Sequence, residues 1–204
     1  PHSESLASPL AGPKLYAEHG GLLFFPSLVH SNWQFLVQTL NLWGLVLDGD
    51  RQAQLTNYVL WAMAGAAAAA VAGRHFGARA GAMAALLVLG IRAAKDLVGS
   101  ATDMFGLTFY VLLFVGAALA WWEAPGDRRK AALVGLCAGC CAATKLLALP
   151  IVALTLAACA GRALVSLPGP VSRRARALVV PALLATVVAG PFYLKNWIVA
   201  GNPV

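Results

Sequence analysis

Apolar residues fill most of this chain in long blocks, and polar residues fall in short clusters between the blocks. A soluble core of this size would need helices or strands with one polar face, and the long blocks leave little room for one. Blocks approaching twenty residues match the thickness of a bilayer's hydrocarbon core. We therefore predict an all-α, polytopic bundle of about six transmembrane helices, at about 53–73, 78–92, 102–122, 131–147, 149–166 and 177–198.

The first part of the chain follows a different pattern. Residues 1–31 mix proline, histidine, glycine and charged side chains without a clear period. Residues 33–47 are apolar, but three amides interrupt them in one helical stripe: Gln34, Gln38 and Asn41. This run has the length of a short interfacial helix rather than of a full span. A turn is predicted at Asp48–Arg51.

Two regions follow from these patterns. We expect residues 1–52 to form an outer-face loop with interfacial helices, and residues 53–204 to form a transmembrane helical region. The chain lacks an initiator methionine and opens in a polar segment. We therefore expect both regions to belong to one longer membrane domain.

Composition supports a membrane protein and argues against a nucleic-acid partner. The chain is 60% apolar and 11% charged, with a mean hydropathy of +0.74. Its net charge of +7 would suit nucleic acid. However, the cations lie mainly in short loops between predicted spans, where they set the orientation of membrane proteins.

Charge in the loops predicts which ends of the spans share a side. Alternate loops carry the basic clusters: Arg74, His75 and Arg79; Arg128, Arg129 and Lys130; Arg173, Arg174 and Arg176. The positive-inside rule makes these loops cytoplasmic. The other ends then face outward, toward the periplasm if the membrane is a bacterial inner membrane. Arg92 and Lys95 are the exceptions on that outer side.

Cysteine spacing offers two readings. Cys137 and Cys140 have the C-x-x-C spacing of redox and metal sites. They lie in mid-helix among alanines and glycines, without a nearby histidine or carboxylate. Gly135 and Gly139 form a G-x-x-x-G pattern on the same segment, so we favour close helix packing.

Several polar residues at the predicted outer ends are candidates for chemistry: Glu4, Lys14, Tyr16, Asp103, Lys145, Asn196 and Asn202. Ionisable groups at membrane depth are costly and point to function. Each also has a structural reading. Asp103 could be a helix N-terminal carboxylate, Lys145 could extend to the interface, and Glu4 and Lys14 could be solvated loop charges.

Six short patterns in order resemble one superfamily. They are Glu4-Ser-Leu-Ala with Pro13-Lys-Leu-Tyr16, Ser31-Asn with Gln38, Gly49-Asp-Arg-Gln-Ala-Gln-Leu, Gly99-Ser-Ala-Thr-Asp103, the run from Gly135 to Thr144-Lys145, and Pro191 with Lys195-Asn196 and Gly201-Asn-Pro203. Together they resemble the GT-C integral-membrane glycosyltransferases, which include protein O-mannosyltransferases and aminoarabinose transferases. The chain departs from these relatives at Ser8-Pro9, Gln34 and Gln38.

The resemblance implies an inverting glycosyltransferase that uses a polyprenyl-phosphate sugar at the outer face. The acceptor would be a glycan, lipid or protein, and no cofactor is implied. Glu4 falls at the position of the family's catalytic Asp, and Asp103 at a second acidic position. Lys14, Tyr16, Lys145, Asn196 and Asn202 fall at substrate-binding positions.

Two other classes remain open on the sequence. A polytopic transporter would carry polar groups along a path between both faces. A non-catalytic membrane scaffold would need only the helices. No metal site is expected, because the four histidines lack ligand spacing: His2, His19, His30 and His75.

Overall fold

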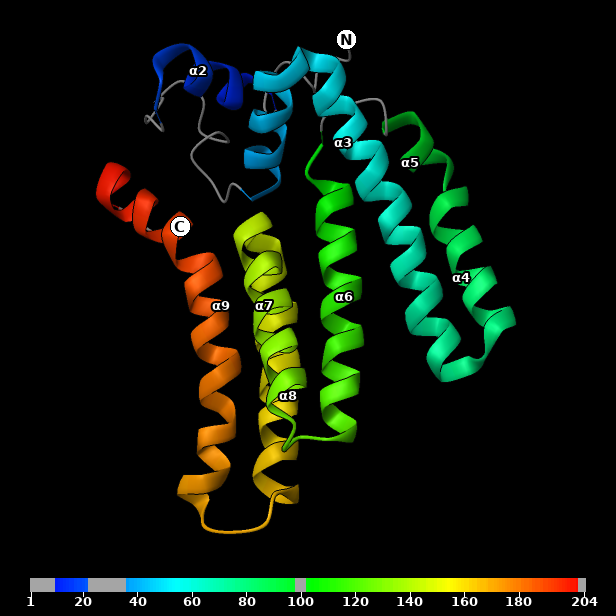
Figure 1. Cartoon of the computed structure of the whole chain (residues 1–204), viewed down its shortest axis with the longest axis vertical. Coiled ribbons are helices and arrows are strands. Elements are labelled where there is room, and N and C mark those ends of the chain that lie inside the picture. The colour runs from blue at the N-terminus through cyan, green and yellow to red at the C-terminus, as the bar shows by residue number, and fades with distance from the viewer. Residues whose placement is uncertain (1–9, 22–35, 98–101, 202–204) are drawn as a thin grey trace.

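The computed structural model describes residues 10–21, 36–97 and 102–201. These residues form an all-α bundle without strands, drawn in Figure 1. Its helices are α2 (Ala11–His19), α3 (Leu36–Phe76), α4 (Ala78–Gly90), α5 (Arg92–Leu97), α6 (Met104–Glu123), α7 (Arg128–Thr144), α8 (Leu149–Ser166) and α9 (Val171–Ala200), with a 3₁₀ turn η2 (Leu146–Ala148) before α8.

Within the described residues, four helical stretches are long and apolar enough to cross a membrane: Leu36–Phe76, Met104–Glu123, Leu146–Ser166 and Arg174–Val199. Only 11% to 33% of the most apolar window of each stretch is buried inside the protein. The remaining apolar surface faces outward, as it does in a bundle surrounded by lipid rather than by water. The helices α4 and α7 are shorter, and the predicted spans at 78–92 and 131–147 were also the shortest of the six.

The predicted span at 149–166 agrees with α8, whereas the predicted span at 131–147 continues past the end of α7. The helix α7 ends at Thr144, and Lys145 is extended with φ −158° and ψ 136°. The next helix, α8, begins at Leu149 with Pro150 in its first turn, where a proline costs no hydrogen bond. Two short helices were not predicted: α2, in a stretch without a clear period, and α5, between the predicted spans.

The helix α3 is two arms joined by a sharp turn. Asp48 and Gly49 leave the helical region, and Gly49 has φ 69° and ψ −153°, a conformation that only glycine adopts readily. The predicted turn at Asp48–Arg51 is therefore confirmed at its first two residues. Gly44 lies against the backbone of Ala53, since a Cβ at Gly44 would be 3.0 Å from the Ala53 nitrogen. The arms consequently run side by side, and the predicted 52/53 boundary falls inside the second arm.

The G-x-x-x-G pattern of α7 packs against α9. A Cβ at Gly135 would be 2.5 Å from the Pro181 carbonyl oxygen, and a Cβ at Gly139 would be 2.6 Å from the Val188 Cβ. Neither glycine could carry a side chain without moving α9. The prediction of close packing by small residues is confirmed, and the four cysteines are free thiols.

The main core lies among α6, α7 and α8 and includes Phe114, Trp121 and Val134. Trp121 is 1% exposed, and its indole donates to the Pro125 carbonyl at 3.0 Å. Trp121 therefore closes the α6–α7 turn from inside the bundle. Trp122 is exposed.

The bundle has two chemically different ends (Figure 1). We call the end where α6 begins and α7 and α9 finish the polar end. It also holds α2 and the α3 turn. We call the opposite end the basic end, because the three arginine-containing loops lie there. The alternation of loops between two sides, predicted from their charge, agrees with this arrangement.

Candidate active site at the polar end

Buried polar side chains gather at the polar end of the bundle. Among the described residues, five polar side chains are buried: Gln38, Asn41, Asn57, Thr144 and Asn196. Their helices place all five in the half of the bundle that contains the α3 turn (Figure 1). Burying amides is costly unless they form hydrogen bonds, so this grouping needs a reason beyond packing.

Asp103 and Lys145 meet at this end although 42 residues separate them. The Lys145 Nζ lies 3.3 Å from the Asp103 Oδ1, and the two side chains are 24% and 21% exposed. The α6–α7 packing brings them together, because Asp103 precedes α6 and Lys145 follows α7. The Met104 Sδ is 3.8 Å from the same Nζ.

The carboxylate of Asp103 pairs with Lys145 and does not cap its own helix. Asp103 occupies the N-cap position of α6, yet its side chain caps no backbone N–H. Asp127, at the matching position of α7, accepts from the backbone of Arg129 and Lys130 at 2.8 and 3.3 Å. Asp103 is therefore a helix N-terminal carboxylate, as one reading of the sequence expected, but it makes no capping bond of the kind that Asp127 makes.

Lys14 pairs with a carboxylate that the sequence did not single out. Its Nζ lies 2.8 and 2.9 Å from the two Asp50 oxygens, joining α2 to the α3 turn. The two side chains are 37% and 50% exposed. An ion pair this exposed contributes about 0–1 kcal/mol, so Lys14 can exchange Asp50 for another anion at little cost.

The two arms of α3 enclose an incompletely bonded pair of amides. The Asn57 Nδ2 lies 3.4 Å from the Asn41 Oδ1 and 3.1 Å from the Ala53 carbonyl. Both side chains are fully buried. The Asn41 Nδ2, the Asn57 Oδ1 and the nearby Gln38 Oε1 have no hydrogen-bond partner among the described residues. These atoms are strong unused donors and acceptors.

Tyr16 and Asn196 are both buried, at 2% and 5% exposure. Tyr16 lines a mostly apolar cavity of about 290 Å³ between α2 and the first arm of α3. The Asn196 Oδ1 has no hydrogen-bond partner in the part of the chain that the structure describes. Nearby on α9, the Tyr193 hydroxyl donates to the Ala142 carbonyl of α7 at 3.1 Å.

Two of the predicted site residues, Glu4 and Asn202, lie outside the described residues. Of the others, the structure joins Asp103 to Lys145 directly and leaves Lys14 with Asp50. The sequence-based prediction missed Asp50 and Asn57. Asp50 follows a glycine in an apparent surface turn, and Asn57 lies among polar residues that look like the start of a span.

The described residues hold no group of three or more histidine, cysteine, aspartate or glutamate side chains that could bind a metal ion. Comparison with known proteins adds no assignment: no protein family, no curated protein and no solved structure matches the chain.

Proposed function

We propose that this protein transfers a sugar from a polyprenyl-phosphate donor to an acceptor at the outer face of a membrane. The observation that carries the proposal is the Asp103–Lys145 pair, partly buried at the end of the bundle away from the arginine-rich loops. Four membrane-length apolar stretches supply the setting that a lipid-linked donor needs.

The reaction is a displacement at the anomeric carbon of the sugar. The bond from that carbon to the phosphate oxygen breaks, and the lipid phosphate leaves with its negative charge. A lysine held in a partly dry site stabilises this charge more strongly than one in water. Asp103 orients Lys145 toward the phosphate, and Lys14 provides a second cation once it leaves Asp50.

The acceptor must lose a proton as it attacks. A carboxylate within hydrogen-bond reach performs this step in many enzymes. Glu4 is our candidate for the base, on the strength of its resemblance to the family position. Asp103 is less suited to the role, because its Oδ1 is occupied by Lys145.

A transporter is the main competing class. It requires polar groups along a path between the two faces. The five buried polar side chains of the described residues instead lie toward one end, which supports chemistry at a single face.

The test is transfer from a radiolabelled polyprenyl-phosphate sugar by the purified, full-length protein. We expect Lys145→Met and Glu4→Gln each to lower the rate by about 100-fold or more, the usual scale for losing a charge stabiliser or a base. Arg79→Gln is the matched control, since Arg79 is exposed at the basic end. Transfer that is unchanged in Lys145→Met would refute the assignment.

A further inference from the structure

A cavity of about 430 Å³ lies at the basic end, far from the polar site. It forms where the α6–α7 turn faces the α8–α9 turn and the first turns of α9. Its lining includes Asp127, Arg128, Leu167, Arg176, Ala177 and Val180. Nothing in the proposed sugar transfer uses this cavity.

The two arginines of the lining are available, whereas Arg74 and Arg174 at the same end are engaged. Arg74 pairs with Glu123 at 2.6 Å. Arg174 donates to the Leu164 and Gly169 carbonyls at 2.7 and 2.9 Å, which fastens the α8–α9 turn. Neither Arg128 nor Arg176 has a side-chain hydrogen bond or an ion pair with any other residue that the structure describes.

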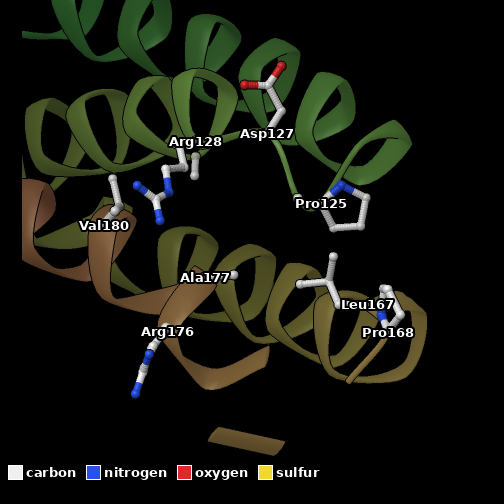
Figure 2. Close-up of a pocket in the computed structure, with 10 residues that line it drawn as sticks. Pro125, Asp127, Arg128, Leu167, Pro168, Arg176, Ala177 and Val180 are labelled. Atoms are coloured by element: carbon white, nitrogen blue, oxygen red, sulfur yellow. The ribbon is translucent and has the colours of Figure 1, made fainter. Parts of the chain in front are cut away.

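The acidic residue of the lining does not neutralise these arginines. Figure 2 shows the Asp127 carboxylate turned away from the other lining side chains, while Arg128 reaches toward α9 near Val180 and the Arg176 guanidinium points away from Arg128. The Asp127 Oδ1 accepts from two backbone N–H groups of α7. The opening is therefore positively charged, and Leu167, Ala177 and Val180 give it apolar walls.

We infer that this cavity binds the phosphate headgroup of an anionic membrane lipid from the leaflet at the basic end. Guanidinium groups bind phosphate oxygens through paired, charge-assisted hydrogen bonds. Basic pockets between membrane helices commonly accept such headgroups. The apolar walls suit the glycerol and first acyl carbons, which a free phosphate ion lacks.

The test compares lipids on the purified, full-length protein in a neutral detergent. Phosphatidylglycerol and phosphatidylcholine with identical acyl chains are titrated separately, and bound lipid is counted by native mass spectrometry alongside the melting temperature. We expect phosphatidylglycerol to bind at least about tenfold more tightly and to raise Tm by about 5 °C near saturation. Equal binding of the two lipids would overturn the inference.

Variants locate the site. Arg128→Gln should weaken phosphatidylglycerol binding by about tenfold, the effect of losing one charged hydrogen bond. Arg176→Gln should weaken binding less, because the Arg176 guanidinium points away from Arg128 (Figure 2). Arg79→Gln, at the same end but outside the cavity, should leave binding unchanged. Similar losses in all three variants would mean diffuse surface attraction and would overturn the inference.

Two further experiments test the inference even if an arginine variant folds poorly. Ala177→Phe fills the cavity without changing charge and should abolish the lipid preference, whereas Ala182→Phe, on the exposed side of α9, should retain it. Inorganic phosphate is titrated as well. If phosphate alone reproduces the stabilisation by phosphatidylglycerol, the site binds a free anion and the lipid assignment is wrong.

Discussion

Asp103 and Lys145 form an ion pair that is about three-quarters buried on each side. A charge removed from water is costly, and its partner offsets most of that cost. Removing one partner therefore leaves the other charge buried without compensation. Removing both charges takes away the interaction and the cost together.

We predict that Lys145→Met lowers the free energy of unfolding by about 1–3 kcal/mol, below the range for a fully buried pair. Asp103→Asn combined with Lys145→Met should recover at least half of that loss. Thermal unfolding in detergent gives the four values of the double-mutant cycle. Lys14→Met is the control, with a change within about 1 kcal/mol because its pair is exposed. A strictly additive cycle would show that the Asp103–Lys145 contact has no energetic weight.

The buried amides of α3 allow a second prediction at this scale. Asn57→Leu should destabilise the protein by about 1–2 kcal/mol, because Asn41 then loses its partner inside the bundle. Adding Asn41→Leu should restore stability, since the orphaned amide disappears. Chemical or thermal unfolding measures both. If the double variant is as unstable as the sum of the two single ones, the amides do not act as a unit.

At the scale of single elements, features set by local sequence signals could be predicted, whereas features set by packing could not. The ends of α8 and the break at Lys145 follow from the apolar run and from Pro150, which are local signals. The short helix α2 was missed because its nine residues include Gly12 and Pro13 and show no helical stripe. Pairing of Lys14 with Asp50 depends on where α2 packs, and no pattern along the chain records that.

The turn inside α3 should depend on one glycine. We predict that Gly49→Ala lowers the free energy of unfolding by about 1–3 kcal/mol, because alanine tolerates φ 69° with ψ −153° poorly. Gly90→Ala is the matched control. Gly90 ends α4, and a Cβ added there would have nothing within 4 Å, so alanine should be neutral or slightly stabilising. Equal effects at the two sites would argue against strain at the turn.

The contact of α7 with α9 gives a second prediction at the scale of an element. Gly139→Val should separate the two helices and cost about 2 kcal/mol or more, since its side chain would overlap Val188. Gly161→Val on α8, where nothing lies within 4 Å of a Cβ, controls for the loss of a glycine. Thermal unfolding in detergent measures the difference. A Gly139 variant as stable as its control would mean that α9 can move away freely.

For the whole molecule, the sequence predicted which segment ends lie on the same side, but it did not predict which side chains touch. Loop charge correctly grouped Asp103 and Lys145 at one end, because orientation depends on composition alone. Their direct pairing depends on the register of α6 against α7, which is set by side-chain fit between distant segments. The G-x-x-x-G pattern likewise indicated a close contact but could not name α9 as the partner.

Orientation in the membrane can be tested directly. In a variant with its four cysteines replaced by alanine, we introduce Leu147→Cys at the polar end or Ser172→Cys at the basic end; both positions are exposed. A membrane-impermeant thiol reagent added to intact cells should label only the first, because the arginine-rich loops stay inside. Labelling at residue 172 before permeabilisation would reverse the proposed outer face.

The small residues that let α7 approach α9 also make α7 the least hydrophobic of the long helices. It begins with Arg128, Arg129 and Lys130 and continues through alanine, glycine and cysteine, and it is absent from the membrane-length apolar stretches. During synthesis, such a segment gains little by entering lipid alone. The short link from Lys145 to Leu149 ties it to the much more apolar α8. We therefore expect α7 and α8 to insert together as a hairpin. The helix α7 then reaches its final position only after α9 packs against it.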